Sequence, residues 1–494
     1  MNSHPLLRPG DRVLVGSSLL EVSGEFAGSL QPGDRVVGAA GSGLLRRIPA
    51  SVVSLVDDAL SRAVEAFTLL QSCPASAVDD FFASAARRAA DDRVLAPVLA
   101  ANAEDVEDAR RRGRSTTRLV LSDSMRHGMV EALEMWRAAQ TRTDAVSVVD
   151  HDGWRVEEHR APLGVIGFVF EGRPNVFADA TGVLRGGNTV VFRIGSDALR
   201  TARALMEHVV SPALAEAGLP VGAVQLVESA EHAAGWALFA DDRLALAVAR
   251  GSGEAVAELG AIARQAGTPV SLHGTGGAWM IVGETFDGSR LSAVVEHSLD
   301  RKVCNTLNTV CVVGSAAGRA VPVVLAAAER AAARRGRRAR VHVTESALPF
   351  VGEPETIPVS RAGGETAEQN LTVCSEEHLG HEFEWEDNPE FHLHVVPDLA
   401  TAVSLFNRLA PRFIVSCVSS DPLDHRAVWE GCDAPFVGDG FTRWVDGQFA
   451  LLRPELGLSN WQSGRLFARS AVLSGDSAFT VRLRVTQDDP GIHR

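Results

Sequence analysis

The chain of 494 residues contains no tyrosine, a single lysine and no long run of apolar residues. A membrane-spanning helix needs about 20 apolar residues in a row, so no membrane span is expected. Acidic residues outnumber basic ones by 62 to 48, which gives a net charge of −14. Proteins that bind nucleic acid or anionic lipid depend on basic surfaces, so we expect neither partner. The first residues lack the basic start and apolar core of a secretory signal, and we expect a cytoplasmic protein.

Cysteine and the common catalytic motifs are also scarce. The six cysteines form no C-x-x-C pair and are too few for a disulfide scaffold, so we expect reduced thiols, one or two of them reactive. The sequence has no P-loop, no G-x-S-x-G elbow and no dinucleotide-binding glycine fingerprint. His392 and His394 lie two apart on a predicted strand. Because the sequence places no further ligand beside them, we expect no metal site.

Residues 1–54 differ in composition from the rest of the chain. The sequence PGDRV occurs at 9–13 and again at 32–36, each time before a stretch of small residues. Pro-Gly-Asp turns that lead into short Val and Leu runs predict β-hairpins, so we interpret this part as an N-terminal extension. From Leu55 to about Gln140 the apolar residues recur at helical spacing, and Ser122-Asp123 is a predicted helix cap.

After Pro162 the pattern alternates between strands and helices. Continuous apolar strands that alternate with amphipathic helices predict a parallel sheet covered on both faces, which is a doubly wound α/β domain. A second alternating block runs from about 283 to 430, and its predicted helix 289–302 leads directly to Cys304. The predicted strands of the first block are 163–170, 188–193, 223–227, 244–249 and 269–272, with a long helix at 196–217.

Three segments carry residues suited to chemistry. In 162–198 a strand is followed by the turn EGRPN and a helix, which places Asn175 at the carboxyl edge of the predicted sheet, where open α/β folds bind ligands. The segment ARGSG (249–253) has a glycine-bearing turn that allows close approach of a ligand. In RKVCNTLNTV (301–310), Cys304 follows the basic pair Arg301-Lys302. Nearby positive charge favours the nucleophilic thiolate.

These segments, together with 99–113, 153–167 and 441–469, resemble the γ-glutamyl phosphate reductase family, also called glutamate-5-semialdehyde dehydrogenases, of the aldehyde dehydrogenase superfamily. The resemblance covers roughly residues 55–485. It implies an α/β, aldehyde dehydrogenase-like fold of two doubly wound parallel-sheet domains, a small β oligomerisation arm and the N-terminal extension. The implied parts are the extension (1–54), a nicotinamide-binding domain (55–282, with 145–160 in the arm), a catalytic domain (283–432) and a return to the first domain and arm (433–494).

The resemblance also implies an activity and its residues. The expected reaction is the NADPH-dependent reduction of L-glutamyl 5-phosphate to L-glutamate 5-semialdehyde, a precursor of proline. The expected partners are further copies of the chain, in a homo-oligomer (dimer or tetramer), and the kinase that makes the substrate. Cys304 matches the catalytic thiol, and Asn175 matches an oxyanion-stabilising amide. The implied cofactor-binding residues are Arg193, Ser196, Gly251 and Ser252, with Glu384 or Glu386 at the ribose. The implied substrate-binding residues are Arg173, Asn305, Arg443 and Glu455, and Ser459 matches a further family position.

Three stretches depart from the family pattern. The family's GSGH is replaced by LAPRF (409–413), and the chain reads TRWVDGQFALLRPE (442–455) and FARSA (467–471) in place of TRFADGGEFGLGAE and HARGP. Oxidative aldehyde dehydrogenases carry a water-activating carboxylate where this chain has His273, so a phosphate leaving group is favoured over water. The alternatives are a reductase for another acyl phosphate or acyl thioester in a specialised pathway, and a non-catalytic subunit that binds a kinase or carrier.

Overall fold

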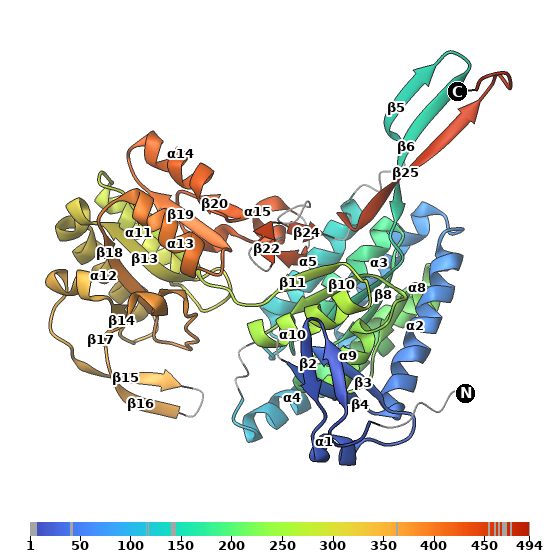
Figure 1. Cartoon of the computed structure of the whole chain (residues 1–494), viewed down its shortest axis with the longest axis horizontal. Helices are drawn as coiled ribbons and strands as arrows, with labels where there is room; N and C mark the ends of the chain where they lie inside the picture. The colour runs from blue at the N-terminus through green and yellow to red at the C-terminus, as the bar shows by residue number, and fades with distance from the viewer. Residues whose placement is uncertain are drawn as a thin grey trace. The chain divides into compact units, whose positions relative to one another are not determined.

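The structure is a computed structural model that describes residues 7–39, 43–114, 116, 118–139, 145–361, 364–452, 455–458, 461–462, 465–466, 472–474 and 477–493. The chain forms two compact units. The first comprises Met1–Gly274, Leu452–Gly457 and Val472–Arg494, and the second comprises Thr275–Leu451 and Leu458–Ala471. Figure 1 colours the chain from its N-terminus to its C-terminus. Among the described residues, no helix is long and apolar enough to cross a membrane.

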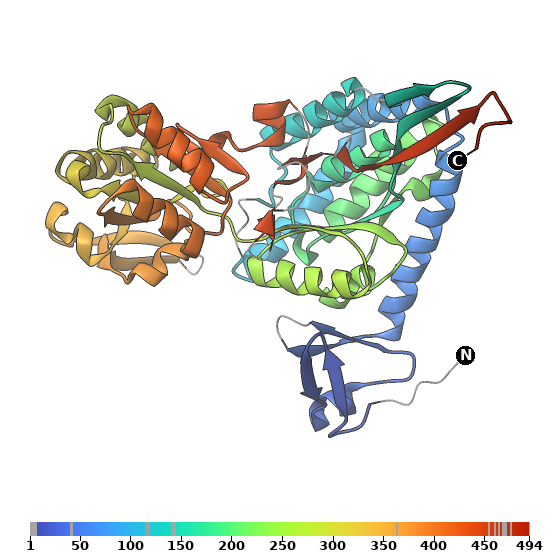
Figure 2. The same cartoon turned by 45° about the horizontal axis from the view of Figure 1, so that its top comes forward.

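Two β-hairpins form at the two PGDRV sequences, as predicted. Strand β1 (Arg12–Val15) pairs with β2 (Ser18–Glu21), and β3 (Arg35–Ala39) pairs with β4 (Leu44–Ile48), with helix α1 (Gly24–Ser29) between the hairpins. The same turn precedes both. Asp11 accepts a hydrogen bond from the Arg8 amide at 2.7 Å, and Asp34 accepts one from the Gln31 amide at 2.8 Å. Figure 2 shows this part in blue.

The described residues of the predicted helical region form four helices. They are α2 (Ala50–Leu70), α3 (Ala75–Ala90), α4 (Asp92–Arg111) and α5 (Asp123–Ala138). Ser122 caps α5 as predicted, because its hydroxyl accepts a hydrogen bond from the Met125 amide at 3.2 Å. Trp136 is fully buried and donates its ring N–H to the Ala178 carbonyl, so the apolar face of α5 belongs to the core.

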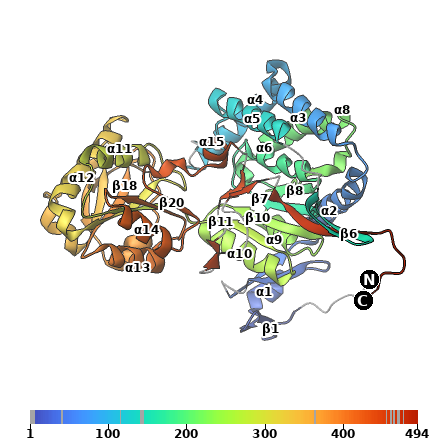
Figure 3. The same ribbon diagram turned by 90° about the horizontal axis from the view of Figure 1, so that it is seen from above.

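The first unit contains a five-stranded parallel sheet in the order β11-β10-β7-β8-β9. The strands are β7 (Val165–Val169), β8 (Thr189–Arg193), β9 (Val224–Leu226), β10 (Leu244–Arg250) and β11 (Val270–His273). One core packs this sheet against α3, α5, α6 (Val176–Thr181), α7 (Leu199–Leu205) and α8 (Ser211–Glu216). A second core packs the other face against α2, α9 (His232–Phe239) and α10 (Gly253–Gln265). Helices therefore cover both faces (Figure 3), and the predicted doubly wound architecture is confirmed.

The long helix predicted at 196–217 is interrupted. A 3-10 turn, Ser196–Ala198, precedes α7, and a π-helical turn, Met206–Val210, separates α7 from α8. Pro212 lacks the N–H that would bond the carbonyl of His208 four residues earlier. Arg88 donates to that carbonyl instead, at 3.3 Å.

The second unit contains a seven-stranded sheet in the order β17-β14-β18-β13-β12-β19-β20, in which all the neighbouring strands are parallel. The strands are β12 (Ala278–Val282), β13 (Leu307–Val313), β14 (Arg340–Val343), β17 (Leu371–Val373), β18 (Glu390–Val396), β19 (Ile414–Val418) and β20 (Phe436–Gly438). Alternate residues face two cores, one with α11 (Gly288–Ser298) and α12 (Ala317–Ala333), the other with α13 (Leu399–Leu409) and α14 (Pro422–Gly431). A hairpin of β15 (Thr356–Arg361) and β16 (Gly364–Gln369) stands beside this sheet.

A three-stranded antiparallel sheet extends from the first unit (Figures 1 and 2). Its strands are β5 (Ala145–His151), β6 (Trp154–Pro162) and β25 (Phe479–Gln487), and β25 is an edge strand, as its alternating sequence predicts. This is the small β arm of the expected fold. The remaining tail contains short elements: α15 (Gly447–Leu451), β21 (Glu455–Leu458), β22 (Trp461–Gln462), β23 (Arg465–Leu466) and β24 (Val472–Ser474).

Candidate active site

Asn175 lies where the sequence predicts, in the turn between β7 and α6. It is the N-cap residue of α6, yet its side chain makes no capping hydrogen bond. Its amide oxygen is buried and accepts no hydrogen bond from the described residues. Buried polar groups almost always find partners within the protein. The side-chain oxygen of Asn175, which lacks such a partner, is therefore available to a ligand.

Charged side chains surround this turn at the carboxyl ends of the strands. Arg173 is 2.9 Å from Glu171, and Arg250, the last residue of β10, is 3.3 Å from Asp179. Burial disfavours the Glu171 carboxylate, but the guanidinium groups of Arg173 and Arg250 outweigh it and lower the pKa of Glu171 to about 2. Burial also lowers the pKa of Arg173, with a further contribution from Arg250. His273 ends the neighbouring strand β11 and interacts electrostatically with Glu171.

The predicted cofactor residues of the first unit lie along the same edge. Arg193 ends β8, is buried, and donates to the Ala230 carbonyl at 3.2 Å, while its Nε has no hydrogen-bond partner among the described residues. Arg193 is therefore not a solvent-exposed strand end. Ser196 begins the turn after β8. Gly251 and Ser252 follow β10, and Ser252 is the N-cap residue of α10 without a side-chain capping bond.

Cys304 lies in a loop between α11 and β13 and is partly exposed. The helix predicted to reach residue 302 ends at Ser298, so this loop is longer than expected. Gly276 packs directly against it, since a Cβ there would lie 2.6 Å from the Cys304 Cα and 2.8 Å from its Cβ. The Gly277 amide donates to the Cys304 carbonyl at 2.7 Å. Backbone contact therefore fixes the position of the thiol, and only glycine fits at 276.

Hydrogen bonds close the cysteine loop on itself. The Thr306 hydroxyl donates to the Arg301 carbonyl at 2.6 Å and accepts from the Val303 amide at 2.9 Å. The Asn305 amide donates to the Val445 carbonyl at 2.7 Å, and its oxygen accepts a hydrogen bond from Arg443. The structure thus brings two predicted substrate residues, Asn305 and Arg443, together beside Cys304.

Lys302 is not an isolated positive charge beside Cys304, as the basic-pair argument assumes. Its buried ammonium group forms an ion pair with Glu382 and lies 3.7 Å from Glu384. The other carboxylate oxygen of Glu382 accepts from the Gly276 amide at 2.6 Å. Glu382 therefore links two sides of the cysteine loop, and sequence reasoning missed it. Glu384 and Glu386, the predicted ribose ligands, are both exposed.

The family model of the aldehyde dehydrogenase family matches residues 36–344, which include Asn175 and Cys304. The chain belongs to the aldehyde dehydrogenase family. It is therefore an aldehyde dehydrogenase-type oxidoreductase, a class that works with a nicotinamide cofactor.

Individual relatives within this family are similar over different shares of the chain. A γ-glutamyl phosphate reductase of Rhodopirellula baltica is 29% identical over 375 residues, covering 73% of this chain and 79% of that protein. One from Bradyrhizobium diazoefficiens is 35% identical over 237 residues, covering 45% of this chain and 53% of that protein. The crystal structure of γ-glutamyl phosphate reductase from Thermotoga maritima has a TM-score of 0.75 at 21% identity, covering 89% of this chain and all of that one. The structural likeness supports the aldehyde dehydrogenase fold.

The other cysteines of this aldehyde dehydrogenase differ from Cys304 in their surroundings. Cys311, Cys417 and Cys432 are buried in the core of the second unit. Burial raises the pKa of Cys311 strongly and raises the pKa of both Cys417 and Cys432 to about 12. Such thiols are poor nucleophiles at neutral pH because the thiolate is the reactive form.

Two predictions concern residues that belong to different units or lie outside the described residues. Asn175 lies in the first unit and Cys304 in the second, so their joint use in one reaction stays a prediction from the resemblance. Glu455 begins β21 in the tail. Ser459 and the segment 467–471 lie outside the described residues.

Proposed function

We propose that this aldehyde dehydrogenase reduces L-glutamyl 5-phosphate to L-glutamate 5-semialdehyde and releases phosphate. The relatives from R. baltica and B. diazoefficiens carry the name of that activity. The observation that carries the proposal is the Cys304 loop. Among the six cysteines, Cys304 is the one held by glycine contacts in a partly exposed loop, and an acyl phosphate needs such a nucleophile.

Cys304 performs the covalent step in this proposal. Its thiolate attacks the acyl carbon, the carbon–phosphate oxygen bond breaks, and phosphate departs to leave a thioester on Cys304. A reduced nicotinamide, when bound, supplies the hydride that turns the thioester into an aldehyde. When the aldehyde forms, the C–S bond breaks and Cys304 leaves as the thiolate, ready for another cycle.

Asn175 stabilises the charge that develops during both steps. Each tetrahedral species carries negative charge on one oxygen, and the side-chain N–H of Asn175 donates to it. The amide makes no capping hydrogen bond to its own helix. Its oxygen also has no hydrogen-bond partner among the described residues, so this side chain is not committed to a contact within the fold.

NADPH is the proposed cofactor, and Arg193 is the residue proposed to favour it. Its buried Nε has no hydrogen-bond partner among the described residues, which fits an anionic group such as a 2′-phosphate. Ser196 follows β8, and Gly251 and Ser252 follow β10, at the same edge of the sheet. Glu382 joins Glu384 and Glu386 as a candidate for the ribose. The measurement is kcat/KM for NADPH and NADH. An advantage for NADH, or no change in the ratio in Arg193→Met, contradicts the assignment.

A second candidate substrate class is another acyl phosphate or an acyl thioester. It is favoured by Arg412, which stands in the altered segment LAPRF and has φ 54°, a backbone conformation that favours glycine. Arg412 places a charged side chain in the segment that replaces the family's GSGH.

The deciding assay runs the reaction in the oxidative direction with NADP⁺ and the semialdehyde. We expect oxidation to depend on added phosphate or arsenate, and His273→Ala to retain most of this activity. Oxidation in phosphate-free buffer that is lost in His273→Ala would make the protein a hydrolytic dehydrogenase. Turnover with other aldehydes but not with the semialdehyde would favour the second substrate class.

The proposed partner is a second copy of this chain, bound through the β arm. Exposed apolar side chains lie on β5 and β25, where a subunit interface would bury them. They are Val146, Val148, Val149, Val481, Leu483 and Val485. Light scattering of Leu483→Glu measures the oligomeric state, and an unchanged mass argues against this interface. The kinase that makes the substrate is a further proposed partner.

A further inference from the structure

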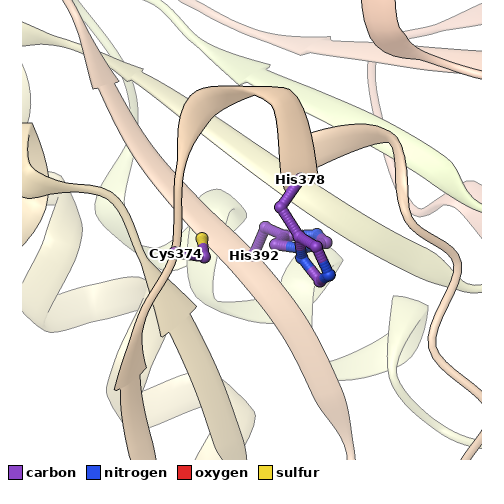
Figure 4. A group of neighbouring side chains, drawn as sticks. All are labelled: Cys374, His378 and His392. Atoms are coloured by element: carbon purple, nitrogen blue, oxygen red, sulfur yellow. The ribbon is translucent and has the colours of Figure 1, made fainter.

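A group of sulfur and imidazole side chains lies beside β17 and β18, outside the proposed reaction. Cys374 follows β17, His378 lies in a 3-10 turn (Glu376–Gly380), and His392 is in the middle of β18. One possible ligand atom of each lies within 4.8 Å of the others. Figure 4 shows the two imidazole rings against each other, with Cys374 on the segment that leads from β17 toward His378.

The spacing of these groups is close to that of a metal site. His378 Nδ1 and His392 Nε2 form a hydrogen bond of 3.1 Å, which a bound ion replaces. Two nitrogens bound to one tetrahedral zinc ion at about 2.0–2.1 Å are roughly 3.3–3.4 Å from each other, and a thiolate sulfur lies about 3.6 Å from each nitrogen. The histidine pair therefore already has almost the required separation. A shift of about 1 Å at the thiol completes the set.

Thr309 orients the ring of His392. The Thr309 hydroxyl donates its proton to the Leu379 carbonyl at 2.9 Å, and its oxygen lies 3.4 Å from His392 Nδ1. Because that proton is used, His392 Nδ1 acts as the donor to Thr309. The lone pair then lies on His392 Nε2, the atom that faces His378. Metal-bound histidines commonly donate their second ring N–H in this way.

We infer that Cys374, His378 and His392 bind a zinc-like divalent cation. Thiolate and imidazole ligands select zinc and similar transition metals over magnesium and calcium, which prefer oxygen ligands. His378 is exposed, so water fills a fourth position. The sequence predicts no metal here because His392 and His394 alone are too few, and the fold brings the other two ligands from a separate segment.

The ion stabilises the turn that leads to Glu382. Its three ligands come from the end of β17, from the 3-10 turn and from β18, so the ion joins three segments. Four residues after His378, Glu382 binds Lys302 and the Gly276 amide beside Cys304. We therefore expect zinc to raise the thermal midpoint of unfolding. Binding itself does not depend on the proposed function.

Cobalt(II) is the probe, because a cobalt–thiolate bond gives a charge-transfer absorption band. The full chain carries Cys304→Ala so that the loop thiol does not contribute, and it is stripped of metal before titration. We expect one equivalent of Co²⁺ to bind at micromolar or lower concentration and to be displaced by Zn²⁺. Cys374→Ser abolishes the band, and His378→Ala weakens binding at least tenfold.

Matched controls use a histidine and a thiol outside the group. His381→Ala, whose ring lies 4.7 Å from that of His378, and Cys73→Ser keep the band and the affinity. Absence of the band, or a band that survives both Cys374→Ser and His378→Ala, overturns the site. Where a variant does not fold, the rise in thermal midpoint with Zn²⁺ is compared between the parent and His378→Ala, an exposed position. An equal rise in both also overturns it.

Discussion

The two parallel sheets carry their candidate residues at opposite ends of their strands. In the first unit, Asn175, Arg193 and Gly251 stand at or after the carboxyl ends of β7, β8 and β10. In the second unit, Gly276 and Cys304 precede β12 and β13, at the amino ends. The carboxyl edge follows the general rule for ligand sites in open α/β sheets. The thiol is instead held by backbone contact, so the two regions achieve their geometry by different means.

Removing the thiol tests the second region most directly. Cys304→Ala is expected to lower the rate of reduction by about 10⁴-fold or more, because no other group forms the thioester. Cofactor binding and the thermal midpoint should stay unchanged. Limiting iodoacetamide is expected to label Cys304 first, since burial raises the pKa of Cys311, Cys417 and Cys432. Activity that survives the substitution contradicts the assignment.

The first region is the easier of the two to predict from sequence. The strand–turn–helix pattern around EGRPN is local, so it places Asn175 at the sheet edge without knowledge of the tertiary fold. The alternation in β25 likewise predicts an edge strand. In the second unit, the apolar pattern at 289–302 predicts a helix that is one turn too long, because residues far away in the sequence bind the residues after Ser298. The Ser298 hydroxyl accepts from the Thr442 amide, and Asp300 pairs with Arg443.

The second region depends on contacts that the sequence does not reveal. Lys302 and Glu382 are 80 residues apart in the sequence. Their ion pair neutralises the positive charge of Lys302, which the sequence alone suggests is available to favour the Cys304 thiolate. A carboxylate shortly before a predicted buried strand is the available signal for Glu382, but Glu384 and Glu386 share it. Gly276 is one of several glycines in its segment. Its close contact with Cys304 is visible in the fold alone.

Asn175 gives the largest expected effect in the first region. Asn175→Ala is expected to lower kcat by about 10²–10³-fold, which is the usual cost of one oxyanion donor. Because the side chain makes no capping bond, the thermal midpoint should change little. Steady-state kinetics with a melting curve separates the two effects. A large loss of stability with unchanged kcat would make Asn175 a structural residue.

Gly276 tests whether backbone contact fixes the thiol. In Gly276→Ala the new methyl group would lie 2.6 Å from the Cys304 Cα, so the loop must move. A displacement of about 1 Å at a reacting group costs about 10²-fold in rate. Gly288→Ala is the matched control, since a Cβ there meets nothing within 4 Å. Equal activity in the two variants shows that the loop tolerates the shift.

Glu171 tests the charged edge of the first region, where the expected change is in stability. Its pKa of about 2 lies below the ordinary value of 4.5, so the folded state favours the carboxylate. The contribution is present above pH 4.5 and is lost as the pH falls toward 2. A shift of this size corresponds to on the order of 3 kcal/mol.

The measurement is the urea midpoint of the parent, Glu171→Gln and the exposed-site control Glu65→Gln at pH 6 and pH 3.5. Glu171→Gln should lower the midpoint at pH 6 and flatten its pH dependence, because Arg173 and Arg250 then no longer face a carboxylate at position 171 at any pH. If Glu171→Gln behaves like Glu65→Gln at both pH values, other groups stabilise the two arginines. Charge would then not be what distinguishes the strand ends of the first unit from the Cys304 loop, which backbone contacts hold.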